Sequence, residues 1–158
     1  MNFYLILKEI HAYNRYFILL ALAFVLVTAY TGWLRKAPYR KPDNIGAAAL
    51  LGLCHLQLLV GLLLFWLSPY GLPAFSSGAA SERGSWARYF TMEHLGAMIV
   101  AIGLIQVGRS LAKKATESTQ KHRTIAIYAT IATLLIIGTL AHKGLVLGRI
   151  ADAVNMGQ

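Results

Sequence analysis

The sequence predicts an all-α integral membrane protein, a four-helix bundle whose helices run up, down, up and down through the bilayer. Hydrophobic residues make up 57% of the 158-residue chain and charged residues only 13%, with a mean hydropathy of +0.56. Soluble domains of this size are less apolar. The apolar residues also fall into four continuous runs, each close to the roughly 20 residues that a helix needs to cross the hydrocarbon core. Because the runs do not alternate with period two, a β-barrel is not expected.

The four runs define the expected transmembrane helices, in chain order. They cover residues 15–34, 45–68, 87–109 and 124–146. The first run is not a cleavable signal peptide, since it is long for one and leads into a charged loop. Residues 69–86 are rich in Gly, Pro and Ser and are expected to form an outer loop. No internal repeat is visible, so residues 1–158 are expected to form a single membrane domain.

Basic residues set the expected orientation, because short basic loops are retained in the cytoplasm. Nine of the fifteen lie around the first and third connections, at Arg35, Lys36, Arg40, Lys41, Arg109, Lys113, Lys114, Lys121 and Arg123. We therefore expect these loops inside and both termini on the outer, periplasmic side. The formal net charge of +9 then indicates contact with the anionic headgroups of the lipid bilayer rather than with nucleic acid.

Histidines carry the expected chemistry, because phosphate loops, catalytic triads and CxxC pairs are absent. Polar residues inside a bilayer are costly, and this makes each of them a candidate for function. Four of the five histidines lie in or beside a different expected helix, at positions 11, 55, 94 and 142. Pairs of histidines on facing helices commonly hold b-type haem. The pattern therefore predicts a haem site with histidine ligands.

Depth in the membrane favours one ligand pair over the others. Counted at 1.5 Å per residue from the inner end of each helix, His55 lies at roughly 17 Å and His94 at roughly 22 Å. Helix tilt can absorb that offset, so His55 and His94 are the expected axial ligands of the haem iron. His11 and His142 form a second, shallower pair, and His94 with His142 fits almost as well. One haem b is expected, and a second remains open.

Several neighbouring residues have expected roles. Arg15, one turn from His11, is placed either to pair with haem propionates or to snorkel to the membrane interface. Gln57, about 200° around the helix from His55, is expected to hydrogen-bond to another helix. Cys54 is expected to be a small buried apolar residue. His122, flanked by two basic residues, is expected to lie in solvent.

Five segments then carry a resemblance to known proteins. They are HAYNRY at 11–16, RKAPYRK at 35–41, HLQLLVGLLLFWLSP at 55–69, RYFTMEH at 88–94 and KHR at 121–123. In this order they resemble a family of small four-helix membrane proteins of Bacteroidota that are usually labelled "cytochrome b". The resemblance emphasises His11, Arg15, His55, Gln57, Glu93, His94 and His122, and it gives no support to His142. A bacterial protein of this kind is expected in the cytoplasmic (inner) membrane.

The expected function is electron transport by a membrane-embedded b-type cytochrome, to or from a quinone or a partner subunit of a respiratory or other membrane complex. The sequence shows no sign of a substrate pocket, so a stand-alone enzyme is not expected. Two alternatives remain open. One is a non-haem accessory or assembly subunit whose histidines, Arg15 and Glu93 make polar helix contacts. The other is a metal-handling protein with His11, Glu93, His94 and His142 around an outward-opening site.

Overall fold

The computed structural model describes residues 3–145, and this part of the chain is helical with no strands. Four helical segments are long and apolar enough to cross a membrane. They are α1 (Phe3–Leu34), α2 (Lys41–Leu67), the segment Trp86–Lys114 and α6 (Ser118–Ala141). The prediction of an all-α, multi-pass membrane protein is confirmed at this level.

The third span combines three kinds of helix. It begins with α4 (Trp86–Arg88), continues through the π-helical turn η2 (Tyr89–His94) and ends with α5 (Leu95–Lys114). Ser85 caps its start, because its side chain accepts a hydrogen bond from the Arg88 backbone N–H at 3.1 Å. The preceding connection, expected to be a loop, contains two short helices, α3 (Leu72–Ser76) and η1 (Ala79–Ser81).

Five helix ends differ from the prediction by four or more residues. They are the start of α1, the start of α2 at Lys41, the end of α5 at Lys114 and both ends of α6, at Ser118 and Ala141. The first helix begins at Phe3 rather than at residue 15, and the buried Leu7 and Asn14 show that this added segment packs against the rest of the protein. The fourth helix ends at Ala141 rather than at residue 146. Gly144 adopts a φ of 66° there, in the left-handed region that ends many helices. Hydropathy alone misses this signal, because apolar residues follow the glycine in the sequence.

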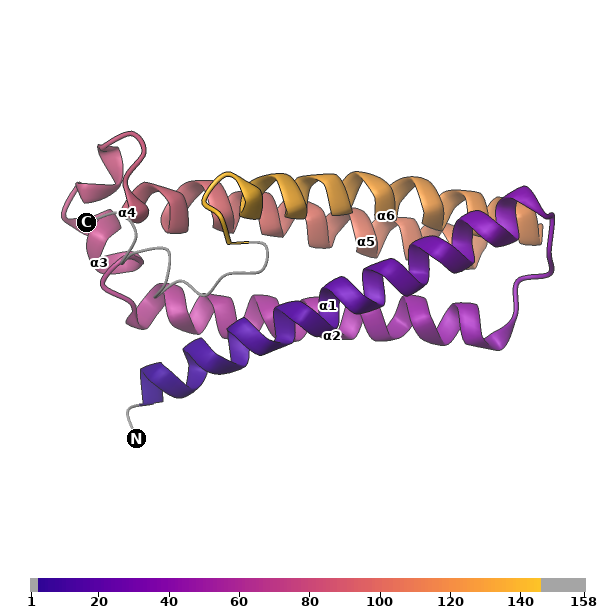
Figure 1. Ribbon diagram of the computed structural model, residues 1–158, viewed down its shortest axis with the longest axis horizontal. Helices are drawn as coiled ribbons and strands as arrows, with labels where there is room; N and C mark the ends of the chain where they lie inside the picture. Colours follow the sequence, from indigo (N-terminus) through magenta and orange to yellow (C-terminus); the bar gives the residue numbers. More distant parts are fainter. Residues whose placement is uncertain (1–2, 146–158) are drawn as a thin grey trace.

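The long helices lie side by side, and α1 crosses α2 diagonally (Figure 1). Residues of α1 pack against α2 and α6, and α5 packs mainly against α6. Leu22, Leu50 and Ala126 lie in the shared core with almost no exposed surface.

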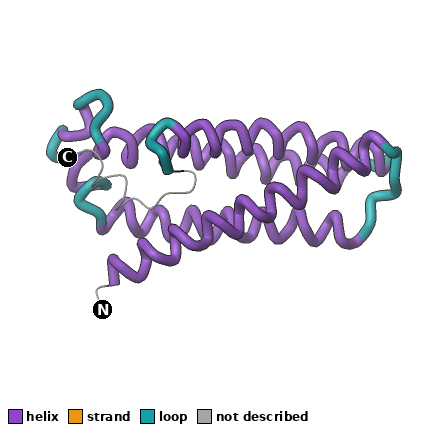
Figure 2. Tube along the Cα trace, in the orientation of Figure 1, coloured by secondary structure: helices purple, strands orange, loops and turns teal. Residues whose placement is uncertain are grey.

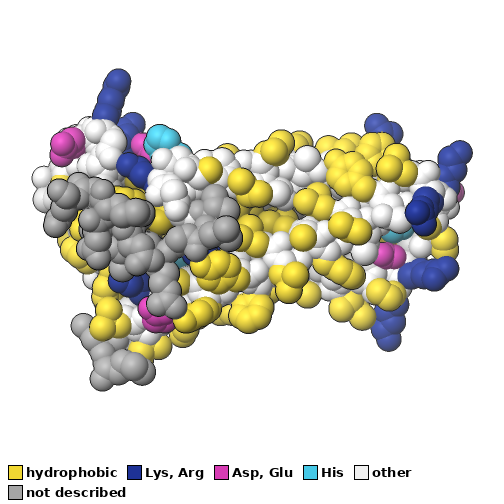
Figure 3. Space-filling model, viewed as in Figure 1, with side chains coloured by type: hydrophobic (Ala, Val, Ile, Leu, Met, Phe, Trp, Pro, Cys, Tyr) yellow, Lys and Arg dark blue, Asp and Glu magenta, His cyan; other side chains and the backbone are white. Residues whose placement is uncertain are grey.

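The connections gather at the two ends of the molecule (Figure 2). We name the end with residues 35–40 and 115–117 the short-loop end, and the end with residues 68–85 the long-loop end. A hydrogen bond of 3.0 Å from the Tyr39 N–H to Ser118 Oγ joins the two short connections. Hydrophobic side chains spread across the middle of the visible face, while Lys and Arg lie toward the ends (Figure 3). This distribution suits a protein whose middle contacts lipid.

Candidate functional site

Two histidines meet inside the long-loop half of the molecule. His11 of α1 and His94, the last residue of η2, have ring centroids 6.2 Å apart and ring planes inclined at 65°. The Nδ1 atoms of both rings are buried and have no hydrogen-bond partner among residues 3–145. Two membrane spans therefore present facing imidazoles whose buried nitrogens are available to a ligand.

A polar network fixes His11 against α2. Gln57 donates from Nε2 to the His11 carbonyl oxygen at 2.9 Å, and Asn14 donates from Nδ2 to Gln57 Oε1 at 2.8 Å and to the Leu53 carbonyl at 3.0 Å. The expected interhelical role of Gln57 is confirmed. Asn14 was missed, although an amide in an apolar helix three residues after a histidine was a usable signal.

Gly61 brings α2 close to the His11 ring. A Cβ atom built on Gly61 would lie 3.2 Å from His11 Cε1, which is tight for two carbon atoms. Any larger residue at position 61 would therefore press on the imidazole. The ring thus lies between the α2 backbone on one side and His94 on the other.

The π-helical turn positions His94. Its wider coil rotates the residues that follow it relative to a regular helix, and such turns are frequent at functional sites. Tyr89, fully buried, lies 5.6 Å from the His94 ring between centroids, and Phe90 lies 6.1 Å from it. Tyr89 Oη also donates to the Thr139 carbonyl of α6 at 3.1 Å. These contacts hold the turn, and with it His94, against α6.

Two charged residues lie close in sequence to these histidines, Arg15 near His11 and Glu93 beside His94, and they make different kinds of contact. Arg15 donates from Nη1 to the Leu145 carbonyl at 2.8 Å, and its guanidinium carbon lies 4.8 Å from the Tyr16 ring centroid. It therefore ties α1 to the chain that follows α6. Glu93 forms an ion pair with Arg88 at 3.3 Å, and the two side chains are 38% and 34% exposed. An ion pair this exposed contributes little to stability.

The structure does not bring His55 and His94 together. The inward face of α2 carries Cys54, Gln57 and Gly61, whereas the His55 side chain is exposed on the outside. The position of His55 along its helix gives its height along the membrane normal but not the direction in which its side chain points. Cys54, the preceding residue, is buried as expected, and successive residues of a helix point about 100° apart.

The expected pairs that include His142 are not formed either. His142 follows the last residue of α6 and is exposed. No ring contact joins it to His11 or His94 in the described part of the chain. Within residues 3–145, no group of three or more His, Cys, Asp and Glu side chains converges in a way that could hold a metal ion.

His122, expected in solvent, is instead one of the most buried side chains. It lies in the second turn of α6 at the short-loop end and is only 2% exposed. The ring packs against Gly32 and lies 5.0 Å from the Tyr39 ring between centroids, and neither nitrogen has a hydrogen-bond partner among the described residues. The signal was its spacing, because His122 precedes Ile125, Ala126 and Ala129 on one helical stripe.

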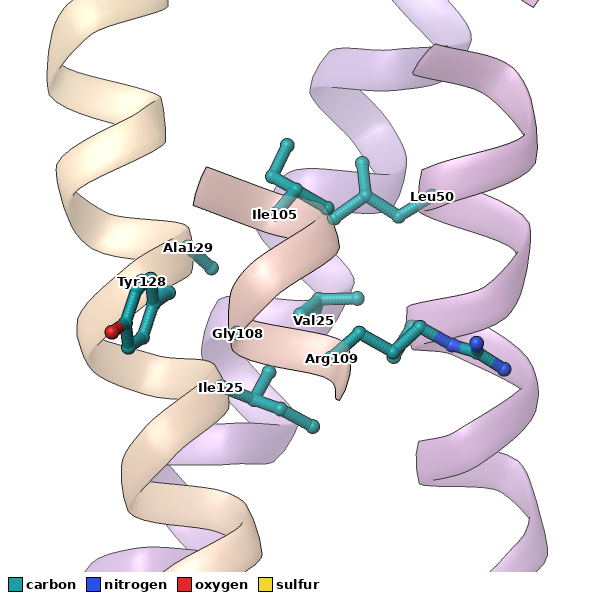
Figure 4. A pocket seen from close by; sticks show the side chains of 9 residues that line it. Val25, Leu50, Ile105, Gly108, Arg109, Ile125, Tyr128 and Ala129 are labelled. Atoms are coloured by element: carbon teal, nitrogen blue, oxygen red, sulfur yellow. The ribbon is translucent and has the colours of Figure 1, made fainter. Parts of the chain in front are cut away.

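A cavity of about 10 Å³ lies deeper in the short-loop half (Figure 4). Val25, Leu50, Ile105 and Tyr128 contribute to its mostly apolar walls. The Arg109 side chain extends from α5 toward α2, away from Tyr128. A space of this size holds at most about one water molecule, so it is not a substrate site.

No family model, no curated protein and no solved structure matches this chain. The facing pair of His11 and His94 is therefore the feature on which a function is argued.

Proposed function

We propose that the protein is a membrane-embedded b-type cytochrome in which His11 and His94 are the axial ligands of one haem. The distance of 6.2 Å between their ring centroids carries this proposal. A metal–imidazole nitrogen bond is about 2.0 Å long, and the ring centroid lies about 1.1 Å beyond that nitrogen. Two imidazoles on opposite faces of one iron therefore have centroids about 6.2 Å apart.

The donor chemistry of the two rings also fits a haem iron. A neutral imidazole has one N–H donor and one bare nitrogen. Burying such a group without a partner costs about 1–3 kcal/mol. Both rings have a buried Nδ1 without a partner in the described part of the chain. Coordination of one nitrogen of each ring would offset part of this cost, and two imidazoles are a common axial pair for b-type haem.

Other residues of the site hold the two ligands in place. Gln57 fixes the His11 backbone to α2, and Tyr89 fixes the His94 turn to α6. Arg15, one turn from His11, would hold α1 against the chain that follows α6 through its bond to the Leu145 carbonyl. When bound, the haem would supply one-electron redox chemistry, and the protein would set its potential through ligation and burial.

The chain would cross the bacterial cytoplasmic (inner) membrane as an up-down-up-down four-helix bundle, with both termini and the long-loop end outside. The basic residues around the short-loop end support this orientation. The haem would lie in the outer half of the bilayer and exchange electrons with a quinone or with a redox subunit of a larger complex.

Visible spectroscopy of the purified, haem-supplied protein tests this function. We expect a Soret band, with an α-band after reduction by dithionite. His11→Ala and His94→Ala should each abolish the six-coordinate spectrum. The matched controls His55→Ala and His142→Ala, at exposed positions, should retain it.

The outcomes distinguish an error in the proposed function from an error in the choice of ligands. A wild-type protein with no Soret band would contradict the cytochrome function and favour the accessory subunit. An unchanged spectrum in both His11→Ala and His94→Ala would overturn the ligand pair. Loss of haem in His55→Ala would show that His55, and not only His11 and His94, is needed for haem binding.

A further inference from the structure

His55 is an ionisable residue exposed at the middle of a membrane span. It lies fourteen residues after Lys41 and twelve before Leu67, the two ends of α2, so each end is roughly 20 Å away. An imidazole is too short to reach the interface from this depth, as a lysine or arginine near a helix end does. In a single chain its polar nitrogens would face hydrocarbon, which is costly and rare.

The residues around His55 form a continuous exposed stripe on α2. They are spaced three or four positions apart and so share one helix face. We name Gly52, His55, Leu59, Leu62 and Trp66 the His55 stripe. Leu59 is 59% exposed and Trp66 70% exposed. A Cβ atom built on Gly52 would meet nothing within 4 Å, so another helix can approach closely there.

We infer that the His55 stripe binds a second copy of this chain in the membrane. Two copies inserted with the same orientation are related by a two-fold axis along the membrane normal, which places identical residues at equal depth. His55 of one copy then faces His55 of the other. Neutral imidazoles are complementary to each other, because the N–H of one donates to the bare nitrogen of the other. A carboxylate or an ammonium group would repel its copy instead.

This interface is independent of the proposed haem site. His11 and His94 face each other within one chain, whereas the stripe lies on the outward side of α2. Each copy would keep its own imidazole pair, and loss of the dimer would leave that pair complete. The haem proposal and the dimer can therefore fail separately.

Dilution of the fluorescently labelled full-length protein in lipid vesicles tests the dimer. Counting photobleaching steps at decreasing protein-to-lipid ratios gives a dimerisation constant. We expect His55→Leu to weaken dimerisation roughly three- to tenfold, the effect of one hydrogen bond between membrane helices. His55→Gln, which keeps a donor and an acceptor, should lose less. His142→Leu, the same change at an exposed position outside the spans, should behave as wild type.

Cysteine crosslinking tests which face is buried in the dimer. In a Cys54→Ala background, oxidation should link two copies through Leu59→Cys on the stripe. It should not link them through Leu134→Cys on α6, which is 69% exposed. A wild-type protein that stays monomeric at every dilution would overturn the inference. So would undiminished dimerisation in His55→Leu, or crosslinking of Leu59→Cys to another protein only.

Discussion

The side chain of His122 packs directly against the backbone of Gly32, on a neighbouring helix. A Cβ atom built on Gly32 would overlap Cε1, Nδ1 and Nε2 of the imidazole. The ring fills the space that the absent side chain leaves, and Tyr39 covers it from the loop after α1. This contact joins α1 to α6 at the short-loop end, and it makes glycine necessary at position 32.

Gly32→Ala should therefore destabilise the protein. The ring or the helix must shift, and overpacking of this kind costs about 1–3 kcal/mol. Gly103→Ala is the matched control, because a Cβ there meets nothing within 4 Å and alanine favours helix by about 0.5–1 kcal/mol. Unfolding in mixed detergent micelles, followed by circular dichroism, measures both free energies. Equal stability of the two variants would show that the His122 ring relaxes without cost.

Gln57→Leu should also destabilise the protein, because it removes the partner of the His11 carbonyl and one partner of Asn14. An unsatisfied buried polar group costs about 1–3 kcal/mol. Gln106→Leu, the same change at an exposed position of α5, should change the free energy of unfolding by about 0.5 kcal/mol or less. A double-mutant cycle with Asn14→Leu should show coupling between positions 14 and 57. Strict additivity would contradict the network.

Lys143→Met should loosen the long-loop end. Lys143 donates from Nζ to the Gly84 carbonyl at 2.7 Å, and the same ammonium lies 5.1 Å from the Trp86 ring centroid. Without it, the exposed Arg83 should be cleaved by trypsin several-fold faster, since proteolysis follows local opening. Lys114→Met, at the other end of the molecule, is the control. A cleavage rate at Arg83 that does not change would mean that Lys143 does not hold this loop.

Tyr39 predicts a pH dependence at the short-loop end. Burial, and then the nearby Asp43 carboxylate, raises the pKa of the Tyr39 phenol above its usual value of 10.0. The folded protein thus holds this proton more tightly than the unfolded chain. The stabilisation is present below pH 10 and is lost as the pH rises through the folded-state pKa.

The free energy of unfolding should therefore fall less steeply in Tyr39→Phe than in the wild type as the pH rises above 10. Denaturation of both proteins at several pH values in this range measures the difference. Parallel curves for the two proteins would contradict the raised pKa.

Much of the fold was predictable from the chain itself. Four apolar runs of sufficient length give four helices, because a backbone in hydrocarbon must satisfy its own hydrogen bonds. The start of α2 had local signals that hydropathy ignored: Pro42 in the first turn, and Asp43 accepting from the Arg40 N–H at 2.8 Å. Residues 1–15 are amphipathic enough either to continue the first helix or to lie on the membrane surface, so the sequence left the extension of α1 to Phe3 open. The extension depends on the contacts of Leu7 and Asn14 with the rest of the protein.

The candidate site was predictable only in part. Histidines as the chemically distinctive residues, Gln57 as an interhelical contact and Cys54 as a buried residue all followed from residue type and spacing. The contact of His94 with His11 did not follow from residue type and spacing. Position along a helix gives depth, but two ligands meet only if their helices are neighbours and turn the right faces toward each other.

The sequence by itself thus determined the all-helical, membrane-spanning class, because apolar length and backbone hydrogen bonding leave few other structures. Only the tertiary structure decided which histidines are buried, which are exposed and which of them contact each other. The crossing of α1 over α2 and the π-helical turn before α5 bring His11 to His94, leave His55 on the outer surface and enclose His122 on Gly32. The physical reason is that helix rotation and crossing are set by side-chain packing between helices, which no single run of residues contains.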